Sequence, residues 1–164
     1  MSATTEIMTT TEVLDKIPNN DFDPALVEKY IIKAQRKYIR PLLGDDFYDQ
    51  ILTQSAAGSL STDNSALVTN YLKPCLAYYV IADAFPSIKS NITSSGVVTL
   101  DHEFSSPASR EDYAALRSQL YSDAEDWRAE VIKYIEDTQE DDSSKFPLWE
   151  KKDNYQSRYG FITY

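Results

Sequence analysis

The sequence predicts a mainly α-helical protein: a helical bundle of about four helices, with a β-hairpin or long loop inserted at residues 87–107 and an extended C-terminal tail. Three observations lead to this fold class. Apolar residues recur every three or four positions in several stretches, which is the spacing of one helix face. Capping residues precede these stretches. Residues 87–107 are instead rich in β-branched residues and contain a turn signal.

The chain of 164 residues is expected to form one domain with flanking segments. We assign residues 1–22 to an N-terminal extended segment, because a threonine-rich start is followed by a break at Pro18. A short helical turn at residues 11–17 is the most that this pattern allows. Residues 23–140 form the predicted helical domain, and residues 141–164 form a C-terminal interaction tail.

The first strong helix is predicted to begin after the capping residue Asp23, with Pro24 at its first position, where the missing N–H is not needed. It should end near Arg40, because the residue before Pro41 is biased away from helical angles. One face of this helix is expected to be buried. The residues of that face are Leu26, Val27, Tyr30, Ile31, Ala34 and Tyr38.

A compact corner joins this helix to the next. Its proline would stop the first helix, its two leucines are expected to be buried, and its glycine permits a backbone angle that other residues resist. Asp45 or Asp46 is then expected to cap a short second helix. We interpret the corner as a scaffold that sets the angle between two helices. It consists of Pro41, Leu42, Leu43 and Gly44.

A longer helix is predicted to begin at Ser61, to kink at Pro74 and to end at Pro86. The segment that follows, residues 87–107, is predicted to be a β-hairpin or a projecting loop, because Ser-Ser-Gly at residues 94–96 is a turn signal between β-branched residues. An isolated hairpin is only marginally stable in water, so it should lean on the helices or on a neighbour.

The last helix has the clearest pattern. Ser109 is expected to cap it, with Asp112 three residues later, and the pattern fails from Glu140 onward. Residues 141–144 are therefore expected to be a polar linker to the tail. The apolar spacing over about three heptads predicts antiparallel bundle packing. The residues that carry it are Tyr113, Leu116, Leu120, Ala124, Trp127, Val131 and Ile135.

Composition excludes several classes of function. The formal net charge of −10 and a pI near 4.5 argue against autonomous tight binding to nucleic acid, which needs clustered Lys and Arg. Cys75 is the only cysteine, so no intramolecular disulfide is expected. The start of the chain lacks the features of a signal peptide, and no apolar stretch is long enough to predict a transmembrane helix. Assembly in a reducing cytoplasm, without a membrane, fits these features.

The usual signs of catalysis are weak. The sole histidine, His102, stands between Asp101 and Glu103, but consecutive side chains on a strand point to opposite faces and cannot converge on a metal. Cys75 is expected to be a packed residue and not a nucleophile. The carboxylates of the last helix fall mainly off its apolar face, which favours solvated or interface charge. We predict no enzymatic activity, no catalytic, metal-binding or cofactor-binding residues, and no cofactor.

Charge is unevenly distributed along the chain. Residues 101–142 hold thirteen acidic and four basic residues, a net charge of −9. The first helix instead carries five cations, mostly on one face. This face is either solvated or complementary to the acidic helix of another copy, and such complementarity would select partner and register more than raw affinity. The five residues are Lys29, Lys33, Arg36, Lys37 and Arg40.

The C-terminal tail is rich in aromatic residues, which supply much of the binding energy in protein interfaces. The tail either folds back on its own domain or reaches into another chain. Addition of residues 159–164 as a β-strand to a neighbour is one form of the second possibility. The aromatic residues concerned are Phe146, Trp149, Tyr155, Tyr159, Phe161 and Tyr164.

The stretch AQRKYIRPLLGDDFYDQI, residues 34–51, resembles the small head–tail connector proteins, also called neck or adaptor proteins, of tailed phages. It looks closest to those of crAss-like and related phages. The resemblance extends over most of residues 11–140. It implies a portal-associated ring, with about twelve copies, that joins the portal to the tail in the neck of the virion and lines the passage for DNA.

The resemblance also implies the partners. These would be other copies of the chain, the portal protein and other neck or tail proteins, with DNA passing through the lumen during ejection without specific binding. Assembly would take place in the host cytoplasm. An acidic protein suits a channel through which DNA must slide. A tail terminator or another tail ring component is the protein most easily confused with a neck ring. The alternative from a different functional class is a cytoplasmic helical protein-binding or regulatory module.

Overall fold

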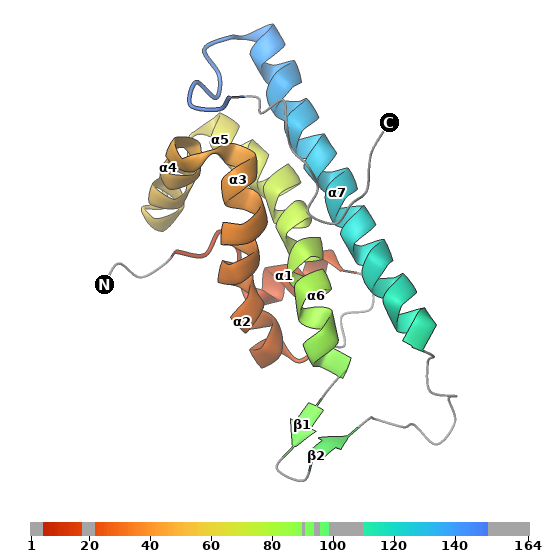
Figure 1. Cartoon of the computed structure of the whole chain (residues 1–164). Helices are drawn as coiled ribbons and strands as arrows, with labels where there is room; N and C mark the ends of the chain where they lie inside the picture. Colours follow the sequence, from red (N-terminus) through yellow and green to blue (C-terminus); the bar gives the residue numbers. More distant parts are fainter. Residues whose placement is uncertain (1–4, 18–21, 90, 94–95, 99–109, 151–164) are drawn as a thin grey trace.

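The computed structural model of the protein describes residues 5–17, 22–89, 91–93, 96–98 and 110–150 (Figure 1). It confirms a mainly helical fold. In these residues the helices join into five segments, because α2 is continuous with α3 and α5 with α6 through π-helical turns. The elements are α1 (Thr10–Lys16), α2 (Pro24–Ala34), η1 (Gln35–Ile39), α3 (Arg40–Leu43), α4 (Asp45–Ala56), α5 (Thr62–Leu67), η2 (Val68–Leu72), α6 (Lys73–Lys89), β1 (Asn91–Thr93), β2 (Gly96–Val98) and α7 (Arg110–Asp141).

Helix α6 is the centre of the fold. It lies between α2 and α7 and also packs against α1 (Figure 1). Tyr79 of α6 stacks on Tyr38 of η1, with ring centroids 3.8 Å apart. Burial of each large apolar side chain stabilises the fold by about 2 kcal/mol, so this helix contributes much of the core. Its fully buried residues are Cys75, Leu76, Ala77, Tyr79, Val80, Ile81, Ala82 and Ala84.

Two prolines lie directly after π-helical turns and do not end their helices. Arg40 has helical angles, and its N–H donates to the carbonyl of Gln35, five residues back. The helix then continues through Pro41 to the end of α3, so the predicted end near Arg40 is wrong. Lys73 makes the equivalent bond before Pro74. In a π-helical turn the N–H donates to the carbonyl five residues back instead of four. This shift occurs next to a proline, which has no N–H to donate, so each helix continues past its proline.

The predicted end of α6 at Pro86 is also wrong, because the helix extends to Lys89. Pro86 has no N–H to give to the carbonyl of Ala82, four residues back. Arg117 Nε of α7 donates to that carbonyl instead, at 3.4 Å. A contact from a neighbouring helix thus replaces the bond that the proline removes.

After α6, strands β1 and β2 pair in antiparallel fashion, with Ile92 opposite Val97. Residues 94–95 and 99–109 lie outside the described residues, and the expected cap Ser109 is among them. The choice between a hairpin and a projecting loop for residues 87–107 as a whole therefore stays a prediction.

The corner between α3 and α4 depends on Gly44. Its φ of +83° and ψ of 160° belong to a region that essentially only glycine adopts. Leu42 and Leu43 are buried beside it. Gly44 is also the N-cap of α4, so the expectation that Asp45 or Asp46 caps this helix is wrong. Both carboxylates lie in the first turn, where they interact favourably with the helix dipole.

Residues 5–17 of the N-terminal segment are folded onto the body, and the short helical turn expected at residues 11–17 is present as α1. Thr9 and Glu12 form a capping box at the start of α1. The buried side chain of Gln35 accepts a hydrogen bond from Ile7 N–H at 2.8 Å and donates to Thr5 O at 3.0 Å. The sequence did not predict these two hydrogen bonds of Gln35. The residues that this segment buries are Ile7, Met8, Val13 and Ile17.

Candidate functional site

Four of the five predicted cations line one shallow hollow on α2 and η1. We call it the basic surface, and its volume is about 520 Å³. The fifth cation, Arg40, lies beyond it and binds Asp45, with 2.7 Å between Nε and Oδ1. An apolar side chain, Ile32, belongs to the same hollow. The residues of the basic surface are Lys29, Ile32, Lys33, Arg36 and Lys37.

Lys37 of the basic surface also reaches a buried carboxylate, Asp83 of α6. The two side chains form an ion pair at 3.2 Å, and that of Asp83 is 5% exposed. Two hydroxyl groups donate to the same Oδ1, from Tyr38 at 2.9 Å and from Tyr121 of α7 at 2.5 Å. A buried charge is tolerated only when it is paired in this way. Asp83 therefore holds η1, α6 and α7 together.

Sequence analysis did not single out Asp83, although a signal exists. It is the only charged residue between Cys75 and Ser87, in a stretch that is otherwise almost entirely apolar. A lone carboxylate within a buried helix requires partners. The sequence does not show that those partners come from two different helices.

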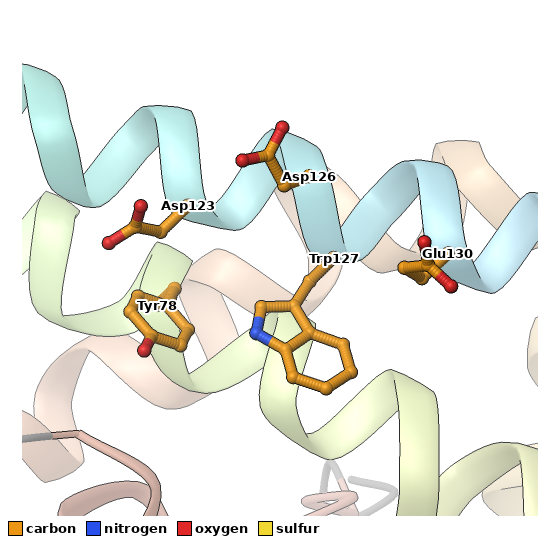
Figure 2. A pocket seen from close by; sticks show the side chains of 5 residues that line it. All are labelled: Tyr78, Asp123, Asp126, Trp127 and Glu130. Atoms are coloured by element: carbon orange, nitrogen blue, oxygen red, sulfur yellow. The ribbon is translucent and has the colours of Figure 1, made fainter.

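A second hollow, which we call the acidic groove, lies between α6 and α7 and has a volume of about 300 Å³. Figure 2 shows the indole of Trp127 directed from α7 toward α6, with the ring of Tyr78 beside it. Both rings are half-buried, while Asp126 and Glu130 are exposed at the rim. The groove thus has an aromatic floor and a negative edge. Its residues are Tyr78, Asp123, Asp126, Trp127 and Glu130.

A family model described as a family of unknown function, DUF6712, matches residues 39–159. This match covers well over half of the chain. The chain belongs to the DUF6712 family. No curated protein and no solved structure matches it. The acidic groove lies inside the matched part of this DUF6712 protein, while all residues of the basic surface precede it.

Two of the predicted interface residues of the DUF6712 protein belong to its own core, which corrects their assignment. Phe146 is 3% exposed, and its ring packs 5.8 Å from that of Phe47 and 6.1 Å from that of Tyr134. Trp149 is 7% exposed, and its Nε1 donates to the carbonyl of Leu42 at 3.3 Å. The chain turns back after α7, so these rings fill the space beside α3 and α4. The remaining tail aromatics, Tyr155, Tyr159, Phe161 and Tyr164, lie outside the described residues.

Cys75 is fully buried, and desolvation raises the pKa of its thiol well above the ordinary value, with a further contribution from Glu125. A protonated thiol in the core does not act as a nucleophile. His102 and its neighbours lie outside the described residues. Among the residues that the structure describes, no cluster of three potential metal ligands occurs, and no helix is long and apolar enough to cross a membrane.

Proposed function

We propose that this protein is a structural, non-enzymatic subunit of the neck of a tailed-phage virion. Copies of it form a ring that joins the portal to the tail and surrounds the passage for DNA. The observation that carries the proposal is the presence of two hollows of opposite charge on different helices of one copy. Each hollow is complementary in charge to the other hollow, and neither is complementary to the same hollow of a second copy. Such a pair favours head-to-tail contacts, which close into a ring when the rotation between copies allows.

The position in the neck and the expected number of about twelve copies rest on the resemblance of residues 34–51 to head–tail connector proteins. The net charge of −10 supports the same function, because an acidic lumen lets DNA pass without binding it. The portal protein and the adjacent neck or tail proteins are the partners that this function requires.

Electron microscopy of the protein mixed with the portal protein of the same phage tests the proposal. Negatively stained particles should show the protein as a ring stacked on the portal, coaxial with its channel. A protein that stays separate from the portal, and forms no ring with it at physiological salt, would contradict the neck function.

One observation favours a second candidate, a helical protein-binding module that works as a single copy. Leu116 lies near the start of α7, where residues 114–116 are all exposed, and it is itself 54% exposed. This side chain and the acidic groove could together bind a basic, amphipathic segment of another protein. A protein that remains monomeric and binds such a peptide in titration calorimetry would favour this function over the ring.

A further inference from the structure

We infer that copies of this chain pack through one defined antiparallel register, in which the basic surface of one copy lies on the acidic groove of the next. This inference rests on the proposed self-assembly and adds the contact that produces it. The other occupants of the acidic groove, a foreign basic peptide among them, are outcomes of the test below.

The register follows from the spacing of the charges. Along α2 and η1, the exposed cations are four and then three residues apart, at Lys29, Lys33 and Arg36. Along α7, the carboxylates of the groove show the same four-then-three spacing when the helix is followed backward from Glu130. Each set covers eight residues, and the seven steps between the first and the last correspond to about 10 Å of helix. Antiparallel packing therefore aligns three pairs at once: Lys29 with Glu130, Lys33 with Asp126, and Arg36 with Asp123.

The same register also brings the apolar centres together. Ile32 lies within the basic surface, and the alignment places it opposite Trp127, whose half-buried indole forms the floor of the groove beside Tyr78 (Figure 2). An interface needs an apolar anchor at its centre and charges around it, and aromatic side chains are the strongest anchors. One alignment thus satisfies three charge pairs and one apolar contact.

The arrangement of the helices makes this contact repeat. In one copy, α2 and α7 lie on either side of α6 (Figure 1). A copy that uses its basic surface for one neighbour keeps its acidic groove for another. The contact is therefore heterologous, and it extends from copy to copy until the assembly closes.

Charge reversal tests the register. Lys33→Glu and Asp126→Lys should each weaken self-association by at least about tenfold, because each places like charges opposite one another. The two variants mixed in equal amounts should assemble, since every contact then pairs opposite charges. A single chain that carries both changes should assemble for the same reason. Sedimentation velocity at physiological salt measures all four samples, and circular dichroism checks that each variant is folded.

Two matched controls change the same charges elsewhere. Lys16→Glu and Asp15→Lys lie on the exposed side of α1, away from both hollows, and should leave assembly unchanged. If the wild type assembles but the mixture and the double variant stay dissociated, the register is wrong while the proposed ring stands. Single variants that assemble as the wild type does would also overturn the register. A wild type that is monomeric at every concentration would overturn both the register and the self-assembly.

Cross-linking provides a second test that does not rely on charge reversal. A chain with both Lys29→Cys and Glu130→Cys keeps the apolar centre and should form a ladder of covalent multimers with a short bismaleimide, because the two positions face each other between copies. Cys75 is fully buried and should not react. A chain with Lys16→Cys and Glu130→Cys is the matched control and should give no ladder. An equal ladder from both chains, or none from either, would contradict the register.

Discussion

Both helices that flank α6 are tied to it by polar contacts, but their two charged surfaces are not equally involved in those contacts. On the α2 side, polar contacts reach across the fold: Lys37 and Tyr38 bind Asp83, and the hydroxyl of Tyr30 lies 2.6 Å from that of Ser87. Helix α7 is tied to α6 as well, through Tyr121 to Asp83 and Glu125 to Tyr79, whereas Asp123 of the acidic groove accepts a hydrogen bond from Gln119 of its own helix at 2.7 Å. Long-range contacts stabilise the fold, while contacts within one helix add little.

This difference predicts which substitutions should unfold the protein and which should only prevent its assembly. The α2 flank combines both roles, because Lys37 belongs to the basic surface and also to the Asp83 cluster. The acidic groove has its rim residues Asp126 and Glu130 exposed, so their substitution should leave the fold intact. Substitutions at these positions separate the effect on the fold from the effect on assembly.

Asp83→Ala should have the largest effect, a loss of about 4 kcal/mol in the free energy of unfolding, because it leaves Lys37 and two hydroxyl groups without their shared acceptor. Urea denaturation followed by circular dichroism measures this loss. Asp126→Ala on the other flank is the matched control and should cost less than about 0.5 kcal/mol. Equal losses for the two variants would remove the distinction between the flanks.

Phe146→Ala should cost about 3 kcal/mol, because it empties a buried site between Phe47 and Tyr134. A chain that ends at Glu150 keeps this site and should be more stable than a chain that ends at Asp142, which loses it. The sequence-based expectation is instead that removal of residues 143–164 leaves the helical body folded. Denaturation of the two truncated chains decides between these views.

Gly44→Val should cost about 2 kcal/mol, because a β-branched residue cannot adopt the backbone angles of this corner without strain. No atom lies within 4 Å of the place where a Cβ would stand, so the effect comes from the backbone and not from a clash. Gly44→Ala should therefore also be destabilising. A melting temperature unchanged in both variants would show that the corner tolerates ordinary residues.

The pairing of Glu12 with Lys73 should have the smallest effect. Burial acts to raise the pKa of Glu12, but the hydrogen bonds from Lys73 and Thr9 outweigh it and hold the pKa below its ordinary value. A carboxylate with a lowered pKa stabilises the fold at neutral pH, and this contribution disappears as the pH falls below about 4.5 through the pKa of the folded state. Glu12→Gln should thus lower stability slightly at pH 7, and the difference from the wild type should shrink as the pH falls below about 4.5. A difference that does not change with pH would exclude this cause.

Local signals in the sequence predicted much of the fold. Asp23 with Pro24 starts α2, Ser61 caps α5, and the positive φ of Gly44 marks the corner. The sequence-based predictions were wrong where tertiary contacts determine the local structure. Proline rules predict helix ends, but π-helical turns and the bond from Arg117 carry the helices onward. No local pattern shows that Phe146 returns to the core, since its site is formed by residues far away in the chain.

The candidate surfaces were predicted only in part. The basic face of α2 is visible in the spacing of its cations, because they follow one helix face. The acidic groove is not visible, since Tyr78 and Trp127 come from different helices and only packing brings them together. The sequence places Trp127 on the buried face of the last helix, whereas the structure leaves its indole half-exposed at the groove.

The mass of the assembled protein is the most direct test of ring formation through opposite charges. Mass photometry of the wild type at physiological salt should show one dominant species near twelve times the chain mass of 18.7 kDa, and this species should dissociate as the salt concentration rises. The salt dependence matters, because screening weakens contacts between exposed charges. A single species at 18.7 kDa under all conditions would show that opposite charges on the two flanks of α6 do not assemble this protein into a ring.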